Sequence, residues 1–345
     1  MKKNIYIYPL SSRDERLGLF NPYIDDLIAS LDNDFNFVNK NKPSNKGILD
    51  ILKYLPKLHF IHFNWIEKIH TNRFGALQYN FMFLLIPIFR LMGIKIIWTM
   101  HNKLSHGVKD DPKTMAIFKL MLRKSHLILT HASAGIDYGE TLVKGVKNKI
   151  VYLPHPIKDR RLPSPSEKKY DVLIWGTISP YKGIDQFLDL LKEKDQLERF
   201  RILIVGKASD SNYFAKLQEF KSAMIDIRDE FIMDKDLAEM ISQSNTVLFT
   251  YSKDSILSSG VLMDSLGYGA NIIGPHVGAF ADLAKDEIIK TFKEPSEAMA
   301  IIDEECKNQI STQSENLDSF IKDNEWPAFG KKFGSLIKEK FRIDS

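Results

Sequence analysis

The chain has 345 residues, of which 44% are hydrophobic and 27% are charged, and its formal net charge is +4. This length predicts two domains or one large one, and the composition is typical of a globular protein with a sizeable core. A single cysteine, Cys306, excludes an internal disulfide and suits a reducing compartment.

The net charge is divided unevenly along the chain. Residues 1–155 hold 22 Lys and Arg against 12 Asp and Glu, a balance of +10, whereas the remaining residues hold 26 against 32, a balance of −6. A basic half joined to an acidic half suggests two domains with different partners. A chance distribution of solvated surface charge is the alternative.

Strand-like runs alternate with helical stretches through the first half of the chain, which favours βαβ units and a parallel sheet. The N-terminal MKKNIYIYPL alternates Ile and Tyr before Pro9, which predicts a first strand and not a signal peptide. Asn21-Pro22 predicts a helix start, with Asn21 as the N-cap and Pro22 as the first helical residue. The expected strands are Ile5–Tyr8, Phe35–Val38, His59–Phe63, Lys95–Thr99, Leu127–Thr130 and Ile150–Leu153.

Residues 79–92 (YNFMFLLIPIFRLM) form the most apolar stretch. A spanning helix needs about 20 apolar residues, and this run contains Pro87 and is closed by Arg90, so it predicts a core helix, with a membrane-dipping helix as the alternative. Between Lys53 and Lys124, basic residues alternate with aromatic ones, and a surface of this kind would suit anionic lipid headgroups. These residues are Lys57, Trp65, Lys68, Arg73 and Phe74. No nucleic-acid-binding motif accompanies the charge.

Residues 153–169 (LPHPIKDRRLPSPSEKK) carry four prolines and many charges, which predicts a linker. After it the alternation restarts, with expected strands at Asp171–Trp175, Arg201–Val205, Ala223–Ile227, Thr246–Thr250, Ala270–Ile273 and Glu287–Thr291. We therefore expect an α/β protein with two Rossmann-like, doubly wound domains that face each other across a cleft. The expected bounds are 1–155 for the first domain, 156–169 for the linker, 170–324 for the second domain and 325–345 for a C-terminal helix that could pack back across the linker.

Residues 254–275 (DSILSSGVLMDSLGYGANIIGP) are the strongest candidate for a binding centre. The turn Ser258–Gly260 precedes a short helix that is expected from about Val261, and the free N–H groups and positive dipole end of such a helix suit a phosphate. Gly260 would let a ligand approach the backbone, and Asp264 could accept hydrogen bonds from sugar hydroxyls. An ordinary capped helix packed on a strand is the alternative.

A lysine marks the loop after the first strand of the second half, in DVLIWGTISPYKGID. Gly176 ends this strand and Lys182-Gly183 starts the next helix, which places the lysine at the edge of the sheet where α/β folds bind ligands. As a mobile point charge, Lys182 could neutralise a diphosphate leaving group. A solvated surface lysine is the alternative.

In the first half, KIIWTMHNKLSH places His101 and Asn102 directly after an apolar strand. An imidazole at this edge can donate or accept a hydrogen bond near neutral pH, although a histidine at a strand end can also be structural. His101 and His106 lack metal-ligand spacing, so we reject a zinc site.

Two further patterns exclude other kinds of site. Asp32-Asn33-Asp34 has the form of a metal-chelating motif but lies at an expected helix-to-strand turn, where these residue types are favoured. The Gly-x-Gly at Gly267 and Gly269 leaves a helix and enters a strand, which is the wrong order for a dinucleotide fingerprint and argues against a nicotinamide dehydrogenase.

Taken together, these motifs resemble those of bacterial glycosyltransferases of the GT-B architecture. The resemblance is greatest to retaining family 4 enzymes that build capsule or exopolysaccharide repeat units, and it covers nearly the whole chain. It rests on NPY (Asn21–Tyr23), TMHN (Thr99–Asn102), LPHP (Leu153–Pro156), GTISPYKG (Gly176–Gly183), VGK (Val205–Lys207) and SSGVLMDSLGYGANIIG (Ser258–Gly274).

The resemblance implies roles for individual residues. Lys182 would bind the donor diphosphate together with the backbone of Ser258–Gly260, His101 would lie beside the transferred sugar, and Asp264 would hold the ribose. The catalytic candidates are therefore His101 and Lys182, and the substrate-binding candidates are Asn102, Gly176, Thr177, Lys182, Gly183, Lys207, Ser258, Ser259, Gly260, Val261 and Asp264. Two family positions differ, since Ile256 stands where the first of two glutamates is usual, and no arginine precedes Lys182 in its loop.

The function implied by the resemblance is transfer of a hexose-type sugar, with retention, from a nucleoside diphosphate sugar. The second domain would hold this donor, and the first domain would hold a lipid-linked or oligosaccharide acceptor. We expect a cytoplasmic enzyme of bacterial surface polysaccharide synthesis that associates peripherally with the anionic inner face of the cell membrane. It would need no metal or cofactor and would have no nucleic-acid partner. The alternatives are a sugar-nucleotide epimerase of the same architecture and a non-catalytic scaffold that binds nucleotide sugars or glycans.

Overall fold

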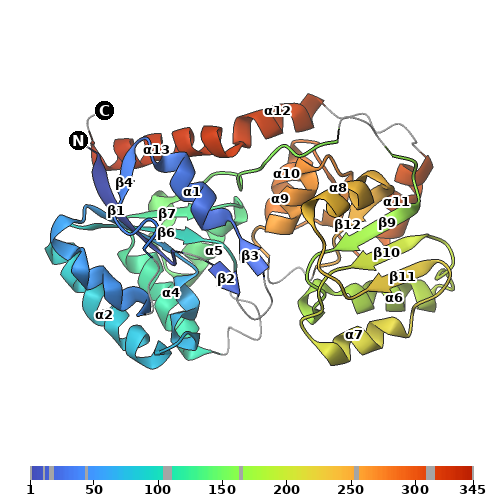
Figure 1. Ribbon diagram of the computed structural model, residues 1–345, viewed down its shortest axis with the longest axis horizontal. Helices are drawn as coiled ribbons and strands as arrows, with labels where there is room; N and C mark the ends of the chain where they lie inside the picture. The colour runs from blue at the N-terminus through green and yellow to red at the C-terminus, as the bar shows by residue number, and fades with distance from the viewer. Residues whose placement is uncertain are drawn as a thin grey trace. The chain divides into compact units, whose positions relative to one another are not determined.

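A computed structural model describes residues 2–10, 12–14, 19–42, 46–103, 111–162, 166–251, 256–307 and 315–343. The chain forms two compact units, the first of Met1–Pro154 with Trp326–Ser345 and the second of His155–Glu325. Each unit is built on a parallel six-stranded sheet with helices packed around it (Figure 1). The expected α/β fold with two doubly wound sheets is therefore confirmed, and each of the twelve expected strands is present with ends shifted by a few residues.

The sheet of the first unit has the order β4-β1-β5-β6-β7-β8. Its strands are β1 (Lys3–Tyr8), β4 (Phe35–Phe37), β5 (Phe60–Asn64), β6 (Lys95–Met100), β7 (Leu127–Thr130) and β8 (Ile150–Tyr152), and β2 (Ser12–Asp14) pairs separately with β3 (Leu19–Asn21). Its helices are α1 (Tyr23–Leu31), α2 (Gly75–Leu91), α4 (Pro112–Lys124), α5 (Ala134–Leu142) and α13 (Trp326–Phe341), with 3₁₀ turns at Gly47–Lys53, Leu55–Lys57, Ile66–Thr71 and Lys147–Lys149.

The sheet of the second unit has the order β11-β10-β9-β12-β13-β14. Its strands are β9 (Tyr170–Trp175), β10 (Ile202–Val205), β11 (Ile225–Arg228), β12 (Ser244–Leu248), β13 (Ile272–Pro275) and β14 (Lys290–Phe292). Its helices are α6 (Ile184–Glu193), α7 (Ser211–Gln218), α8 (Asp234–Ser242), α9 (Gly260–Gly267), α10 (Gly278–Lys285), α11 (Glu297–Lys307) and α12 (Glu315–Asn324), with a 3₁₀ turn at Pro180–Lys182.

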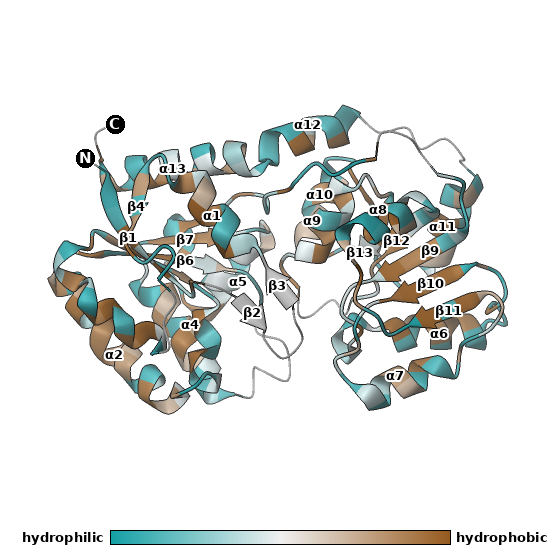
Figure 2. Ribbon diagram, viewed as in Figure 1, coloured by the Kyte–Doolittle hydropathy of each residue, from teal (hydrophilic) through white to brown (hydrophobic). Residues whose placement is uncertain are grey.

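The two strand orders fix where a ligand can bind in each unit. In doubly wound sheets, ligands bind outside the carboxyl ends of the strands at the point where the strand order reverses. This reversal lies between β1 and β5 in the first unit and between β9 and β12 in the second. Most apolar strand residues are buried because both faces of a parallel sheet are covered, and β9 and β10 are mostly brown in Figure 2.

The C-terminal helix α13 belongs to the core of the first unit. Its buried side chains join the same hydrophobic cluster as α1 and the strands, namely Phe329, Phe333 and Ile337. Two glycines allow close contact, since a Cβ at Gly330 would lie 2.2 Å from the carbonyl oxygen of Ser30 and one at Gly334 would lie 2.6 Å from Asp34 Oδ2. The ion pair between Lys338 Nζ and Asp34 Oδ1, at 2.6 Å, holds the far end of the helix.

Two local expectations have different outcomes. The expected N-cap at Asn21 is wrong by one residue, because α1 begins at Tyr23 and the Pro22 carbonyl accepts the first helical hydrogen bond from the Asp26 N–H at 2.9 Å. The expected turn at residues 32–34 is confirmed, since it joins α1 to β4.

The described part of residues 156–169, where the sequence predicts a linker, is hydrogen-bonded to the second unit. The N–H groups of Ile157, Arg160 and Lys169 donate to the carbonyls of Asn324, Gly267 and Gln243 at 3.0, 2.7 and 2.8 Å. Prolines and charges predict a segment without a core of its own, but they carry no information about the surface on which it lies.

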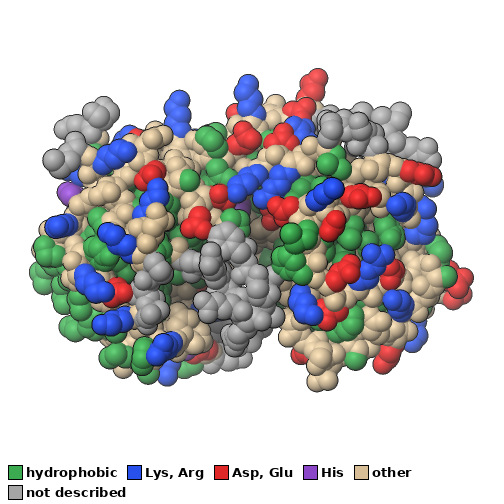
Figure 3. Space-filling view, viewed as in Figure 1, with side chains coloured by type: hydrophobic (Ala, Val, Ile, Leu, Met, Phe, Trp, Pro, Cys, Tyr) green, Lys and Arg blue, Asp and Glu red, His purple; other side chains and the backbone are tan. Residues whose placement is uncertain are grey.

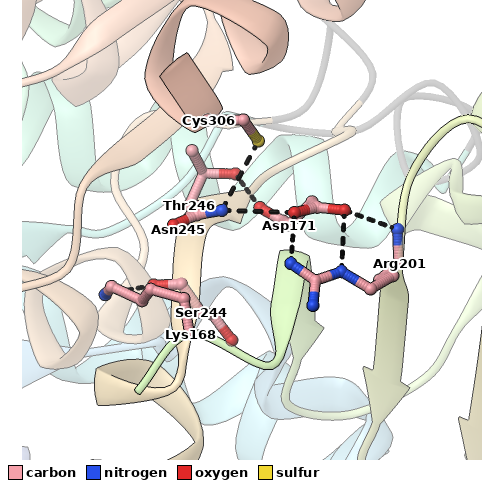
Figure 4. A network of polar contacts seen from close by, with 7 residues as sticks. All are labelled: Lys168, Asp171, Arg201, Ser244, Asn245, Thr246 and Cys306. Carbon is pink, nitrogen blue, oxygen red and sulfur yellow. Dashed lines mark hydrogen bonds and ion pairs between the residues drawn. The ribbon is translucent and has the colours of Figure 1, made fainter. Parts of the chain in front are cut away.

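At the amino ends of the strands of the second unit, Asp171 is the centre of a polar network (Figure 4). Its carboxylate accepts from the backbone N–H and the guanidinium of Arg201, at 2.8 and 2.9 Å, and from the Asn245 amide at 3.2 Å. Burial raises the pKa of this carboxyl, but these hydrogen bonds outweigh burial and hold the pKa below its ordinary value.

We expect Asp171→Asn to lower the free energy of unfolding at pH 7 by about 1.5–3 kcal/mol, since it removes charge-assisted hydrogen bonds. A pKa that is lower in the folded state stabilises above the ordinary Asp pKa, and this stabilisation is lost as the pH falls toward the folded value. The difference between variant and wild type should therefore shrink between about pH 5 and pH 3, as measured by urea unfolding. Asp189→Asn is the control, because this half-exposed residue forms a long ion pair with Lys216 and its replacement should change stability by under about 0.5 kcal/mol. An equal difference at both pH values would contradict the role of the charge.

Candidate functional site

The strand reversal of the second unit is occupied by Lys182. This residue ends the 3₁₀ turn that follows β9, and Thr250 follows the neighbouring strand β12. The Thr250 hydroxyl donates to the Lys182 carbonyl at 2.6 Å. A Cβ at Gly183 would lie 2.8 Å from the Thr250 carbonyl oxygen, and the left-handed φ of +66° at this position also favours glycine. The two loops therefore meet where the fold places ligands.

Lys182 is not the mobile surface charge that the sequence suggests. The residue is only 4% exposed, and its Nζ donates to the Trp175 carbonyl at 2.9 Å. Burial lowers the pKa of its ammonium group to about 7. The lysine is thus held in place before any ligand binds, and an anion beside it would favour its charged form.

Gly176 lies between this lysine and helix α9. Its φ of +86° is left-handed, and a Cβ there would lie 3.1 Å from Lys182 Nζ and 3.4 Å from a methyl carbon of Val261 in the first turn of α9. The glycine therefore allows the ammonium and the amino end of the helix to come close together. A helix amino end and a lysine at one place provide two sources of positive potential.

The amino end of α9 is capped and open. The helix begins at Gly260, one residue earlier than expected, and the N-cap Ser259 accepts from the Leu262 N–H at 3.4 Å. Among the residues that the structure describes, no atom lies within 4 Å of a Cβ placed on the exposed Gly260. The Ser258 hydroxyl oxygen is buried without a hydrogen-bond partner among the described residues. These features leave room for a ligand at the first turn.

Two consecutive hydrogen bonds, which the sequence analysis did not identify, connect β9 to α9. Trp175 Nε1 donates to the Ser265 hydroxyl at 2.8 Å, and this hydroxyl donates to the Val261 carbonyl at 2.8 Å. Trp175 also supplies the carbonyl that holds Lys182. One residue at the end of β9 therefore sets the positions of both the lysine and the helix.

Asp264 lies one turn into α9 and pairs with Arg160, whose Nη1 is 3.2 Å from its Oδ1. The Asp264 side chain is 47% exposed, so part of the carboxylate remains open to solvent. Arg160 also packs over the ring of Tyr268, with 5.4 Å between guanidinium carbon and ring centroid. No sequence pattern connects residues 160 and 264, and for this reason the arginine was missed.

The remaining candidates of the second unit lie nearby with different environments. Thr177 is half-buried beside Gly176. Lys207 follows β10, next to Gly206, whose Cβ would lie 2.1 Å from the Gly176 carbonyl oxygen. The Lys207 ammonium pairs with Asp229 at 3.2 Å. Its charge is thus already matched, whereas the ammonium of Lys182 donates to a carbonyl.

In the first unit, His101 lies just past β6 in a cluster of rings and is mostly buried. Its imidazole hydrogen-bonds Asn64 Oδ1 at 3.0 Å and stacks on Trp65, with 4.1 Å between centroids and 13° between planes. Tyr23 packs edge-on against it at 4.9 Å. Asn102, the next residue, is exposed. His106 lies outside the described residues.

The cluster brings together motifs that are far apart in the sequence. His131, just past β7, donates from Nδ1 to the Leu153 carbonyl at 3.0 Å, so its Nε2 accepts from the Tyr23 hydroxyl at 2.8 Å. Asn64, Trp65 and His131 were not predicted. The signal for them is position, since each follows or ends a strand at the edge where ligands bind.

The described ranges contain no group of three or more His, Cys, Asp or Glu side chains that could hold a metal ion.

Helix α2 has one buried and one exposed apolar face. Met82, Leu85 and Phe89 are buried, which agrees with the predicted core helix. The opposite face exposes Phe74, Leu77, Phe83, Leu84, Leu91 and Met92, here called the α2 surface. Hydrophobic side chains gather over this helix in Figure 3. Within the part of the chain that the structure describes, no helix has the length and apolar character that crossing a bilayer requires.

No protein-family model matches the sequence, and no curated protein matches it. Solved structures are similar in fold. Anabaena Alr3699/HepE in complex with UDP has a TM-score of 0.70 at 12% identity, over 98% of this chain and 100% of that one. A glycosyltransferase from Rickettsia africae has 0.64 at 11%, over 99% and 100%. AviGT4, a glycosyltransferase involved in avilamycin A biosynthesis, has 0.59 at 14%, over 99% and 97%. At these identities the likeness establishes the two-unit α/β fold of GT-B glycosyltransferases.

Proposed function

We propose that this protein is a glycosyltransferase that uses a nucleoside diphosphate sugar as donor. The observation that carries the proposal is the buried Lys182 ammonium beside the open amino end of α9, at the strand reversal of the second unit. Similar folds crystallised with UDP and with UDP-glucose support this choice of ligand.

The chemistry follows from where charge develops. When the bond between the anomeric carbon and the diphosphate oxygen breaks, the electron pair of that bond leaves with the diphosphate. The sugar then acquires oxocarbenium character. Lys182 and the free N–H groups of α9 would stabilise this growing negative charge, and the half-exposed Asp264 would accept hydrogen bonds from the ribose. The proposal includes no metal ion or cofactor.

The first unit would bind the acceptor, and His101 would contact a hydroxyl of the transferred sugar. We further propose transfer of a hexose-type sugar, with retention, to a lipid-linked or oligosaccharide acceptor in bacterial surface polysaccharide synthesis, at the inner face of the cell membrane. The motif resemblance and the position of His101 at a ligand-binding edge support these finer statements.

Thermal-shift measurements with UDP-, GDP- and dTDP-sugars test the proposal first. A ligand at a hundred times its dissociation constant stabilises by about 2.7 kcal/mol, so a matching donor should raise the melting temperature by several degrees. Turnover assays with and without an acceptor extract then separate the alternatives. Conversion of the donor in the absence of an acceptor would indicate an epimerase. Binding of the donor without any turnover would indicate a scaffold. The buried Ile256, which cannot hydrogen-bond a sugar, is the observation that favours the scaffold. Failure of all three donor classes to bind would contradict the proposal.

The α2 surface is proposed as the membrane contact. Leu77, Leu84 and Leu91 are 56, 58 and 88% exposed and, being spaced by seven residues, lie on one side of the helix. The surrounding residues 46–124 contain 13 Lys and Arg against 4 Asp and Glu. Trp65, which the sequence analysis assigned to such a surface, instead packs on His101.

We expect the protein to float with anionic vesicles and to do so less when salt is raised from about 0.1 to 1 M, which shortens the screening length from about 10 to 3 Å. Leu77→Glu with Leu84→Glu should abolish flotation. Leu162→Glu is the matched control because Leu162 is an exposed leucine of the second unit. Equal flotation of all variants would contradict a role for α2, and equal flotation with neutral vesicles would remove the electrostatic part.

A further inference from the structure

An exposed aromatic residue stands beside the buried lysine of the second unit. Tyr181 immediately precedes Lys182 in the 3₁₀ turn after β9, and it is 55% exposed. One face of its ring is covered by the ring of Tyr251, which lies 5.8 Å away between centroids and is inclined by only 7°. Such offset stacking leaves the opposite face of the outer ring in solvent. Tyr181 therefore presents an open aromatic face in the loop that carries the lysine.

This exposed ring is the outer end of a row of rings that reaches the core. Tyr251 is 5% exposed and packs on Phe249 and Phe280, at 5.6 and 6.1 Å between centroids. Phe249 in turn packs on the fully buried Phe280 at 5.2 Å. Because packed interiors yield little, the three buried rings give Tyr181 a rigid support.

Two polar contacts connect the stack to the anion site. The Thr250 hydroxyl donates to the Lys182 carbonyl at 2.6 Å, and these two residues are the chain neighbours of Tyr251 and Tyr181. The Tyr251 hydroxyl lies 3.3 Å from the hydroxyl of Ser259, the N-cap of α9. The open aromatic face is thus connected to both parts of the site, the lysine and the helix.

An open aromatic face of this kind binds another ring. In a nucleoside diphosphate sugar this is the nucleobase, or the pyranose through the apolar face made by its C–H groups, and the diphosphate lies between the two. Asp264, which the proposed function assigns to the ribose, follows Ser259 by five residues, a rise of roughly 7.5 Å along the helix axis. The stack contacts Ser259 itself, at the amino end where the diphosphate would bind. This position favours the sugar, which is attached to the diphosphate on the side away from the ribose.

We propose that Tyr181, supported by Tyr251, is the platform that binds the pyranose ring of the donor. The ring stacks on the open face of Tyr181 through its C–H groups, so that its hydroxyls point outward from the edge of the platform. No bond is made or broken there, and the contribution of Tyr181 is affinity for the sugar part of the donor. This inference rests on the proposed function for the identity of the ligand, whereas the ring stack and its contacts are independent of that function.

The experiment separates the sugar from the rest of the donor. Calorimetry on the full chain uses whichever of the UDP-, GDP- and dTDP-sugars gives the largest thermal shift, together with its free nucleoside diphosphate. Tyr181→Ala should weaken binding of the nucleotide sugar by between about threefold and tenfold, with the dissociation constant of the free diphosphate within about twofold of wild type. Tyr181→Phe, which keeps the ring, should restore most of the lost affinity.

Phe231→Ala is the matched control. Phe231 is an exposed aromatic residue of the same unit, 57% exposed, but it follows the edge strand β11 and not β9. This variant should keep the wild-type ratio of the two dissociation constants. Equal weakening of both ligands by Tyr181→Ala would place the nucleobase on the ring and overturn the inference. An unchanged affinity for both ligands, or the same change of ratio in Phe231→Ala, would also overturn it.

Failure of the proposed function has a different signature. In that case the wild-type protein itself would bind none of the nucleotide sugars, whereas the outcomes for Tyr181 are differences between variants of a protein that binds its donor.

Discussion

Replacing Lys182 by methionine is expected to lower turnover at least about a hundredfold, since removing one preorganised partner of a developing charge typically has this effect. Near pH 9.5 the free energy of unfolding should change by no more than about 1 kcal/mol, because two effects oppose each other. The variant loses the hydrogen bond to the Trp175 carbonyl, but it also no longer buries an ammonium group. The measurements are donor turnover, with the donor identified by thermal shift, and urea unfolding.

The pH dependence of stability should change in the same variant. Burial lowers the pKa of Lys182 to about 7, whereas an unfolded lysine titrates near 10.4. Between these values the unfolded chain binds the extra proton, so this lysine makes stability rise with pH across this window and is most unfavourable below pH 7. Lys182→Met should therefore be more stable relative to wild type at pH 6 than at pH 9.5.

Lys216→Met is the control for the lost charge. Lys216 is a half-exposed lysine of α7 that pairs with Asp185 and Asp189. Its replacement should leave turnover within about threefold of wild type. Turnover of Lys182→Met in that same range would show that Lys182 has no part in the reaction.

The strands were predictable because each is a short apolar run bounded by turn residues, and this signal is local. The strand orders were not predictable. Nothing local shows that the order reverses between β1 and β5 in one sheet and between β9 and β12 in the other. The position of α9 was close to the prediction because Ser259 caps it in the usual way.

The environments of the candidate residues were less predictable than their positions. Lys182 follows a strand in the expected way, but its burial depends on Trp175 and on the space at Gly176. Arg160 meets Asp264 from a segment whose prolines predict only a linker. His101 is held by Asn64, which ends the neighbouring strand, and by Trp65, which follows it. Each of these contacts joins residues that are distant in sequence or depends on side-chain packing. A local sequence pattern shows neither long-range contacts nor packing.

His101→Ala should lower sugar transfer by about a hundredfold or more while the affinity for UDP changes by less than about threefold. The nucleotide would be bound by the second unit, to which His101 does not belong. A hydrogen bond between the imidazole and a sugar hydroxyl would orient the anomeric carbon, and orientation contributes most near the transition state and little to ground-state affinity. The measurements are initial transfer rates at saturating donor and calorimetric titration with UDP.

The control is His126→Ala, since His126 is a partly buried histidine at the opposite end of the same sheet. Its Nδ1 accepts from the Ile96 N–H, at the start of β6, at 3.0 Å. Losing this bond should cost about 1 kcal/mol of stability and leave transfer unchanged. A parallel fall of transfer, UDP affinity and melting temperature in His101→Ala would identify His101 as a structural residue of the ring cluster. Unchanged transfer would place the reaction away from the carboxyl end of β6. The proposed role requires that the transfer rate fall while UDP affinity and melting temperature are unchanged, because the role assigns His101 a contact with the reacting sugar only.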